Sequence, residues 1–230
     1  MIEQLQISTG EPDKENRPKL AAAIDDDWLN VFERYAEDAT TERMQQLWGR
    51  VLAGEIRSPG KFAMRTLRFL SEFSQVDALS FSVFCDSAFG EAAPRSLILP
   101  PEMQDIREVV NLESAGLIQG ASGIGFTRTL NFDDYGNSII REGNLFLLFQ
   151  GEPKSEFQDQ VITLTPMGQE LITLLPSRDP RAAARRVAHS VRSPMIRSAQ
   201  LATVHSEGVT PAPLEALWES EEAAVVENAQ

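Results

Sequence analysis

Histidine and cysteine are the side chains from which general bases, nucleophiles and metal ligands are most often built, and this sequence has few of them. His189 and His205 both lie in the last quarter of the chain, and Cys85 is the only cysteine. One cysteine cannot form an internal disulfide or a thiolate metal site. Cys85 lies within an apolar helical pattern, which predicts a buried thiol without reactivity. We therefore expect no enzymatic activity, no cofactor and no metal site.

Two short segments have the composition of ligand-binding motifs in the wrong context. Asp25-Asp26-Asp27 offers carboxylate oxygens that suit a hard cation, yet three successive residues at the start of a helix point in different directions. We interpret them as a helix cap. The glycine-rich residues 120–125 run from a helix end into a strand, whereas a phosphate loop runs from a strand into a helix N-terminus. We interpret them as a flexible connection.

Glu55 is the polar residue that we single out in the first half of the chain, because it stands just before a turn at Pro59-Gly60. It is either a satisfied carboxylate near a helix end, paired with a neighbouring basic side chain, or a first contact for a partner protein. Pro59 and Gly60 belong to the same candidate interaction site.

A second candidate interaction site is a segment of arginines with alanine and valine between them. Its members are Arg178, Arg181, Arg185, Arg186, Arg192 and Arg197. Within it, Arg181, Arg185 and Arg186 are the candidates for contact with a partner. Such a segment suits an acidic protein, an anionic membrane surface or RNA, although it has no aromatic residue or leucine to insert into lipid. The alternative is a solvated tail that touches the acidic body of its own chain.

The charge distribution bears on the choice of partner. The chain of 230 residues has a formal net charge of −13, of which residues 1–175 carry −12, residues 176–200 carry +5 and residues 201–230 carry −6. An acidic body repels phosphates, which disfavours nucleic acid as a partner. No apolar run is long enough to span a membrane, and the N-terminus lacks the pattern of a secretory signal. We expect a cytoplasmic protein whose partner is another protein, and we leave its oligomeric state open.

Four helices with inward apolar faces are predicted between residues 25 and 90. The first carries Trp28 inward, and the second carries Trp48 inward and ends at Gly54. The third follows the turn that contains the proline-glycine pair. The fourth opens at a capping box formed by residues 74–77. Its inward residues are predicted to be Val76, Leu79, Val83, Phe84 and Ala88.

The pattern changes to a mixture of strands and helices between Leu97 and Leu175. Leu97-Ile98-Leu99 is a strand candidate, and a helix follows from Pro100-Pro101 to Gly116. Thr165-Pro166 caps a last helix. Alternating or continuous apolar residues predict strands at 124–132, 144–150 and 160–165, with a turn at 133–137.

Five motifs stand in order along the predicted helices: Asp27-Trp28, Leu47-Trp48, Leu52-Ala53-Gly54-Glu55, Pro59-Gly60 and Thr66-Leu67. Together they resemble the signature of a bacterial family of domains of unknown function. The resemblance is close over residues 25–81 and extends more loosely to Leu175. It implies no activity for these residues. Lys61-Phe62-Ala63 stands where members of the family usually have a serine after the turn.

A second resemblance concerns the mixed region. Residues 105–118, the two strands after them and residues 164–171 are similar to the latter half of a winged-helix domain, in which a helix leads into a β-hairpin wing and a further helix. Winged helices often bind DNA through the helix before the wing. Here that helix has a net charge of −3, and Leu97-Ile98-Leu99 leads into it without the usual preceding helix. We therefore favour a winged-helix-like module that binds protein.

These observations divide the chain into four regions. Residues 1–20 form a mobile N-terminal arm, residues 21–90 a helical part and residues 91–175 a winged-helix-like part. Residues 176–230 form a mostly flexible tail. The predicted fold class is α+β, with the helical part packed against helices and a small antiparallel sheet. We predict a non-catalytic protein-interaction or regulatory module. The alternative is a nucleic-acid-binding regulator of winged-helix type.

Overall fold

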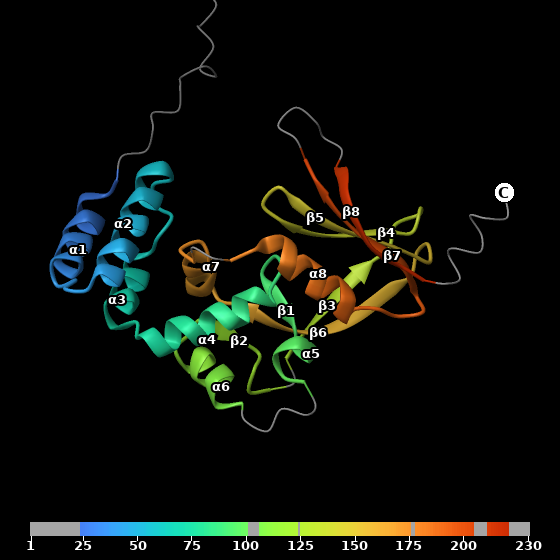
Figure 1. Cartoon of the computed structure of the whole chain (residues 1–230), viewed down its shortest axis with the longest axis horizontal. Helices are drawn as coiled ribbons and strands as arrows, with labels where there is room; N and C mark the ends of the chain where they lie inside the picture. Colours follow the sequence, from blue (N-terminus) through green and yellow to red (C-terminus); the bar gives the residue numbers. More distant parts are fainter. Residues whose placement is uncertain (1–23, 101–105, 124, 176–177, 205–210, 221–230) are drawn as a thin grey trace, which may run out of the picture.

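A computed structural model describes residues 24–100, 106–123, 125–175, 178–204 and 211–220. Over these residues helices and antiparallel sheets combine, which confirms the predicted α+β class. The helices from the beginning of the described chain lie at one end of the molecule, and a sheet that contains the last strand lies at the other (Figure 1). The predicted mobile arm at 1–20 lies outside the described residues.

Side-chain caps open three of the first four helices. These helices are α1 (Asp26–Glu37), α2 (Glu42–Arg57), α3 (Met64–Glu72) and α4 (Gln75–Asp86). The Asp25 carboxylate accepts a hydrogen bond from the Trp28 N–H at 2.9 Å, as the cap interpretation predicts. At the start of α4, Ser74 and Asp77 form the predicted capping box. Local sequence signals therefore place these helix starts correctly.

Gly54 has a different role from the predicted one. Helix α2 does not end there but continues to Arg57. A Cβ atom at Gly54 would lie 2.7 Å from the Phe62 ring, so the glycine allows that ring to pack against the helix. The close contact offsets the loss of helix propensity, which is about 1 kcal/mol relative to alanine.

Aromatic side chains of α1 and α2 form the centre of a first core. Trp28 stacks on Phe32 with ring centroids 5.3 Å apart, and Phe32 meets the edge of Trp48 at 5.6 Å. Both tryptophans are buried, as predicted. Apolar side chains of α3, α4 and the first sheet complete this core.

The first sheet is organised around its longest strand. Its strands are β1 (Ala92–Pro94), β2 (Ile118–Gln119), β3 (Phe126–Asn131) and β6 (Glu156–Leu164). Strand β6 pairs antiparallel with each of the other three. The strands predicted at 124–132 and 160–165 therefore exist as β3 and β6, although residue 124 lies outside the described chain.

Two short helices, α5 (Arg95–Ile98) and α6 (Arg107–Ser114), connect β1 to β2. The strand predicted at Leu97-Ile98-Leu99 is therefore wrong. A run of three apolar residues fits either a strand or a helical turn, and its surroundings decide between them. Here the turn that follows Pro94 places Ile98 in the first core.

The second sheet has the strand order β4-β5-β7-β8, with all pairs antiparallel. Its strands are β4 (Asn137–Glu142), β5 (Leu145–Gly151), β7 (Ile196–Thr203) and β8 (Ala212–Glu219). The predicted turn at 133–137 joins β3 to β4, and β5 matches the strand predicted at 144–150. The predicted last helix is α7 (Pro166–Ile172), capped by Thr165.

The prediction of a mostly flexible tail at 176–230 is wrong for residues 178–204 and 211–220. They form β7, β8 and the helix α8 (Pro180–Ser190), which packs against β5, β7 and β8 (Figure 1). The buried face of α8 consists of small side chains: Ala183, Ala184, Val187 and Ala188. Alanine contributes little to an apolar stripe in the sequence, yet it lets a helix approach a sheet closely, and this is why the pattern misleads.

Helix α4 is rotated relative to its prediction. Phe81, Phe84 and Cys85 face the core. Ala88, which lies just beyond the helix end, is buried as predicted. Three other residues that were predicted to face inward are exposed. The exposed residues are Val76, Leu79 and Val83. Helix α4 has apolar side chains on two faces, and burying the face with two phenylalanines removes more apolar area from water.

Candidate functional site

The predicted site at Glu55, Pro59 and Gly60 is a closed turn after α2. The buried Glu55 carboxylate accepts one hydrogen bond from the Gly60 N–H and a second, at 3.0 Å, from the Phe62 N–H. Gly60 has φ +83°, a left-handed conformation that favours glycine. The partners of Glu55 are therefore backbone amides rather than a neighbouring basic side chain. Both carboxylate oxygens are occupied in holding the turn.

The same turn is attached to its neighbours through its backbone. The indole N–H of Trp28 donates to the carbonyl oxygen of Phe62 at 2.7 Å. The Ala63 N–H donates to the Glu170 carboxylate of α7 at 2.9 Å. A cavity of about 450 Å³ opens beside the turn, between the start of α1 and the start of α3. Its lining includes all three predicted residues, so the structure does bring them together.

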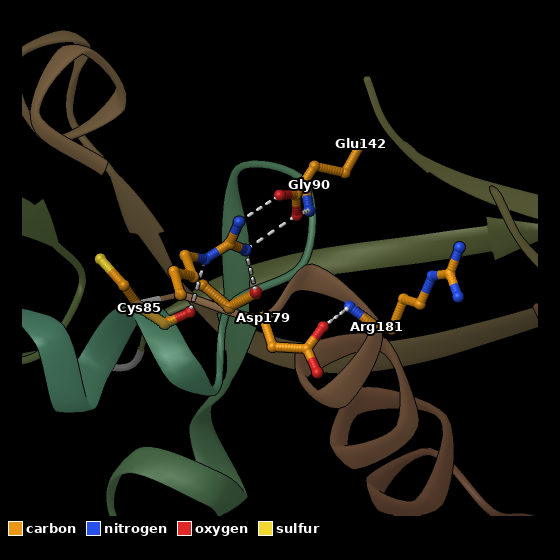
Figure 2. Close-up of polar contacts among 7 residues, drawn as sticks. Cys85, Gly90, Glu142, Asp179 and Arg181 are labelled. Atoms are coloured by element: carbon orange, nitrogen blue, oxygen red, sulfur yellow. Dashed lines mark hydrogen bonds and ion pairs between the residues drawn. The ribbon is translucent and has the colours of Figure 1, made fainter. Parts of the chain in front are cut away.

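The predicted arginine site lies on α8, away from this turn (Figure 1). The Arg185 guanidinium donates to the Glu215 carboxylate of β8 through Nε at 3.0 Å and Nη2 at 2.7 Å. The Arg186 guanidinium donates to the carbonyl oxygen of Asp86 at the end of α4. Two of the three candidates thus contact their own chain, but they do so from a folded helix rather than from the solvated tail of the alternative interpretation. The guanidinium of Arg181 points away from the neighbouring polar contacts (Figure 2).

Arg178 joins the C-terminal segment to the rest of the molecule. Its side chain is only 8% exposed and pairs with the Glu142 carboxylate of β4. It also donates to the carbonyl oxygens of Cys85 at 3.1 Å and Ala88 at 2.8 Å. The same Glu142 carboxylate accepts the Gly90 N–H at 2.9 Å (Figure 2). This arginine clamp therefore connects the end of α4, the end of β4 and the segment that leads into α8.

Cys85 beside the clamp is fully buried, as predicted. Burial raises the pKa of its thiol far above the ordinary value, while the nearby Arg178 charge acts in the opposite direction. A thiol that stays protonated is a poor nucleophile. His189 is exposed on α8, and His205 lies outside the described residues.

The exposed face of α4 is the surface that the sequence analysis assigned to the core. We call Val76, Leu79 and Val83 the α4 stripe, since their spacing of three and four residues aligns them on one side of the helix. They are 68%, 62% and 69% exposed. The segment 69–94 around the stripe contains no lysine or arginine but four acidic residues, a charge asymmetry that the sequence already shows.

Among the residues that the structure describes, no group of three or more histidine, cysteine or acidic side chains is arranged to hold a metal ion. No described helix combines the length and apolarity that crossing a membrane requires.

Comparisons with known proteins identify a family over the first part of the chain. No curated protein and no solved structure matches the sequence. Residues 13–145, more than half of the chain, match the family described as protein of unknown function (DUF2806). This match includes α1 to α6, the turn held by Glu55 and strands β1 to β4. The chain therefore belongs to the DUF2806 family.

Proposed function

We propose that the protein is a non-catalytic interaction module that binds an amphipathic helix of a partner protein on the α4 stripe. The observation that carries this proposal is the exposure of three large apolar side chains, Val76, Leu79 and Val83, aligned on one helix. Helix-in-groove recognition commonly uses anchors three to four residues apart. The pathway in which the module acts follows from the identity of its partner.

The size of the stripe indicates a weak, reversible contact. Burying the exposed parts of two valines and one leucine contributes on the order of 3–5 kcal/mol. Association costs translational, rotational and side-chain freedom of at least similar size. Apolar contact alone therefore gives little affinity, and the remainder must come from charge complementarity.

The charges around the stripe select the partner. Glu72 lies just before α4 and Asp77 in its first turn, whereas the guanidiniums of the two arginines Arg178 and Arg186 contact the other end of the helix. Glu108 of the adjacent helix α6 accepts a hydrogen bond from Ser80 of α4 at 3.3 Å, which adds a third carboxylate nearby. A helix whose apolar face is flanked by lysine or arginine is attracted to this surface, whereas one flanked by acidic residues is repelled.

A pair of designed peptides tests this proposal. Both are 18-residue helices with leucine on one face, flanked by lysine in the first and by glutamate in the second. We expect fluorescence anisotropy to show binding of the lysine peptide only, with affinity falling at least tenfold in Leu79→Asp. The matched control is Ile56→Asp on α2, an apolar site outside the stripe that is 61% exposed. Equal binding of both peptides, or no effect of Leu79→Asp, would contradict the proposal.

Cross-linking in the native host identifies the partner. A photoreactive amino acid replaces Leu79, and a control protein carries it at the exposed Glu33 of α1. The proposal requires a protein that cross-links from position 79 alone, through a peptide with a basic amphipathic pattern. Cross-linking to nucleic acid, or specific turnover of a substrate by the purified protein, would favour a different function.

A nucleic-acid-binding regulator of winged-helix type is the second candidate, and the topology of the first sheet supports it. Helices α5 and α6 lie between β1 and β2, and β6 lies between β1 and β2 in the sheet. This order matches the resemblance to winged helices, and α5 supplies a helix before α6 where the sequence predicts a strand. The exposed Glu108 and the acidic body oppose binding of phosphates.

Salt dependence distinguishes this candidate. Binding of a fluorescent mixed-sequence DNA duplex is measured at 50 and 200 mM salt. Steep loss of affinity with salt, together with loss in Arg107→Gln on α6, would support the regulator. Absence of binding at 50 mM salt would end this alternative.

A further inference from the structure

The second sheet has one face that α8 does not cover. Helix α8 packs against β5, β7 and β8 from one side, where Leu147, Phe149 and Leu201 belong to the second core (Figure 1). Successive side chains of a strand point to opposite sides of a sheet, so the residues that alternate with these core positions lie on the other side. We call that side the outer face.

Strand pairing arranges the outer face as a regular grid. Residues directly opposite each other on neighbouring antiparallel strands share one side of the sheet. Each row of the grid therefore takes one residue from each of β4, β5, β7 and β8. The rows are Arg141-Phe146-Ala202-Pro213, Ile139-Leu148-Gln200-Ala216 and Asn137-Gln150-Ser198-Glu219. None of these residues belongs to either of the two cores that the described residues form.

The composition of the outer face suits contact with a second copy of the chain. Ile139 is 53% exposed, and the neighbouring Phe146 and Leu148 are half-buried, so apolar area remains in water. The charged residues of the grid are Arg141 and Glu219, whereas the whole chain has a net charge of −13. Two acidic chains repel each other over most of their surfaces, but two outer faces carry no excess of negative charge.

The two charges lie at diagonally opposite corners of the grid. Arg141 is on β4 and Glu219 is on β8, three strand spacings away, and their rows are four residues apart along β7. These separations are about 14 Å and about 13 Å, so the two side chains cannot meet within one chain. The Arg141 guanidinium lies over the Phe146 ring, 5.4 Å from its centroid. Neither charge forms an ion pair with another described residue.

One arrangement of two copies brings opposite charges together at both corners. Its twofold axis lies between the two outer faces and runs along the other diagonal, from Asn137 to Pro213. Each Arg141 corner then lies over the Glu219 corner of the other copy. The strands of the two sheets cross at nearly a right angle, which is one of the two ways in which sheets pack. An axis parallel or perpendicular to the strands would place both charges over uncharged corners.

We propose that the protein forms a symmetric dimer through the outer face, with two reciprocal pairs between Arg141 and Glu219. The axis passes between Leu148 and Gln200, so Leu148 of the two copies meets near the centre, and Ile139 loses its exposure to water. Such a contact buries roughly 900 Å² in total, less than most stable dimers bury. The dimer is therefore weak, with a dissociation constant between about 10 µM and 1 mM. It does not depend on the proposed binding of a partner helix.

Sedimentation of the full chain from 5 µM to 1 mM measures the association. We expect the wild type to change from monomer to dimer over this range. Ile139→Asp places a carboxylate in the contact and should weaken association at least tenfold. The matched control is Ile56→Asp on α2, which is 61% exposed in the monomer and should associate like the wild type.

Charge reversal tests the geometry of the corners. Arg141→Glu and Glu219→Arg each place like charges together at both corners, so each variant alone should associate at least fivefold more weakly than the wild type. In an equimolar mixture of the two variants, opposite charges meet again at both corners. We therefore expect the mixture to associate nearly as strongly as the wild type, which would also show that both variants are folded.

Four results would overturn the proposal. They are a wild type that remains monomeric at 1 mM, equal weakening by Ile139→Asp and Ile56→Asp, and a mixture that associates no better than its components. The fourth is loss of the dimer in Leu79→Asp, which would assign self-association to the α4 stripe instead of the outer face.

Discussion

Helices α4 and α8 differ in a way that their compositions do not suggest. Helix α4 is rich in large apolar side chains, yet Leu79 and Val83 are more than 60% exposed. Helix α8 consists mainly of alanine and arginine, yet Ala184 and Ala188 are fully buried. Helix α4 exposes Val76, Leu79 and Val83, which were predicted to face the core, and the segment predicted to be a tail is part of a core.

The difference teaches that burial depends on fit as well as on apolarity. Helix α4 has two apolar faces, and only the face with Phe81 and Phe84 has a core to enter. Helix α8 has one narrow face of small side chains, which matches the surface of the second sheet. If this explanation is correct, an aspartate should destabilise the protein strongly when it is introduced on the buried face of α8 and hardly at all on the exposed face of α4.

The largest difference in stability between variants of the two helices is expected for an introduced charge. Ala188→Asp on α8 places an unpaired carboxylate in the second core, and we expect it to lower the free energy of unfolding by about 4 kcal/mol. Val83→Asp on α4 should change it by less than about 0.5 kcal/mol, because the side chain remains in water. Urea unfolding followed by circular dichroism measures both values. Similar losses in the two variants would refute the comparison.

Removing the arginine clamp should have the next largest effect. Arg178→Met leaves the partly buried Glu142 carboxylate without its partner, and we expect a loss of about 3 kcal/mol in the free energy of unfolding. Arg178→Met/Glu142→Gln should recover part of the loss, since no carboxylate then remains. Arg181→Met is the matched control on the same segment and should unfold like the wild type. A stable single variant would mean that α8 stays docked without the clamp.

The exposed ion pair between Arg185 of α8 and Glu215 of β8 should affect mainly the pKa of Glu215. The hydrogen bond and the charge of Arg185 hold the pKa of Glu215 below its ordinary value. Because the folded pKa is lowered, the pair stabilises the protein above the ordinary glutamate pKa, and this contribution is lost as pH falls through the folded value. Arg185→Met should raise the pKa of Glu215 in a carboxyl NMR titration and lower the urea midpoint at neutral pH only slightly, because an exposed pair contributes little to stability. A large fall of that midpoint would show that the pair is structural.

The smallest effect on stability is expected at the α4 stripe. Leu79→Ser removes an exposed apolar side chain, so the free energy of unfolding should change by less than about 0.5 kcal/mol. Amide hydrogen exchange along α4 should also remain close to that of the wild type. A strong loss of protection would mean that Leu79 supports the core and would remove it from the candidate interaction surface.

Local signals in the sequence predicted more of the fold than long-range patterns did. The cap at Asp25 and the capping box at Ser74 depend on neighbouring residues, and both are confirmed. The orientation of α4 depends on which of two faces finds a core, and the position of α8 depends on a sheet formed by distant strands. Neither can be derived from the residues of the helix alone.

The candidate sites show the same limit. The sequence correctly placed Glu55 beside the turn, but the carboxylate is occupied by backbone amides that no spacing rule identifies. Arg128 carried a usable signal, because it alternates with Phe126 and Leu130 and thus shares a strand face with apolar residues. A charged residue in such a register indicates a buried ion pair or a ligand site, and the structure shows an ion pair of Arg128 with Asp159 of β6.

The position of β6 has a consequence for the order in which the chain acquires its structure. During synthesis β1, β2 and β3 leave the ribosome before residues 156–164, the strand with which all three pair. Until then these segments lack a partner in the first sheet, and their open backbone groups are suited to contact with other chains. A fragment that stops at residue 145, where the family match ends, would lack β6 and would therefore leave β1, β2 and β3 without their partner strand. Chaperone dependence and aggregation should therefore decline sharply once the chain extends past residue 164.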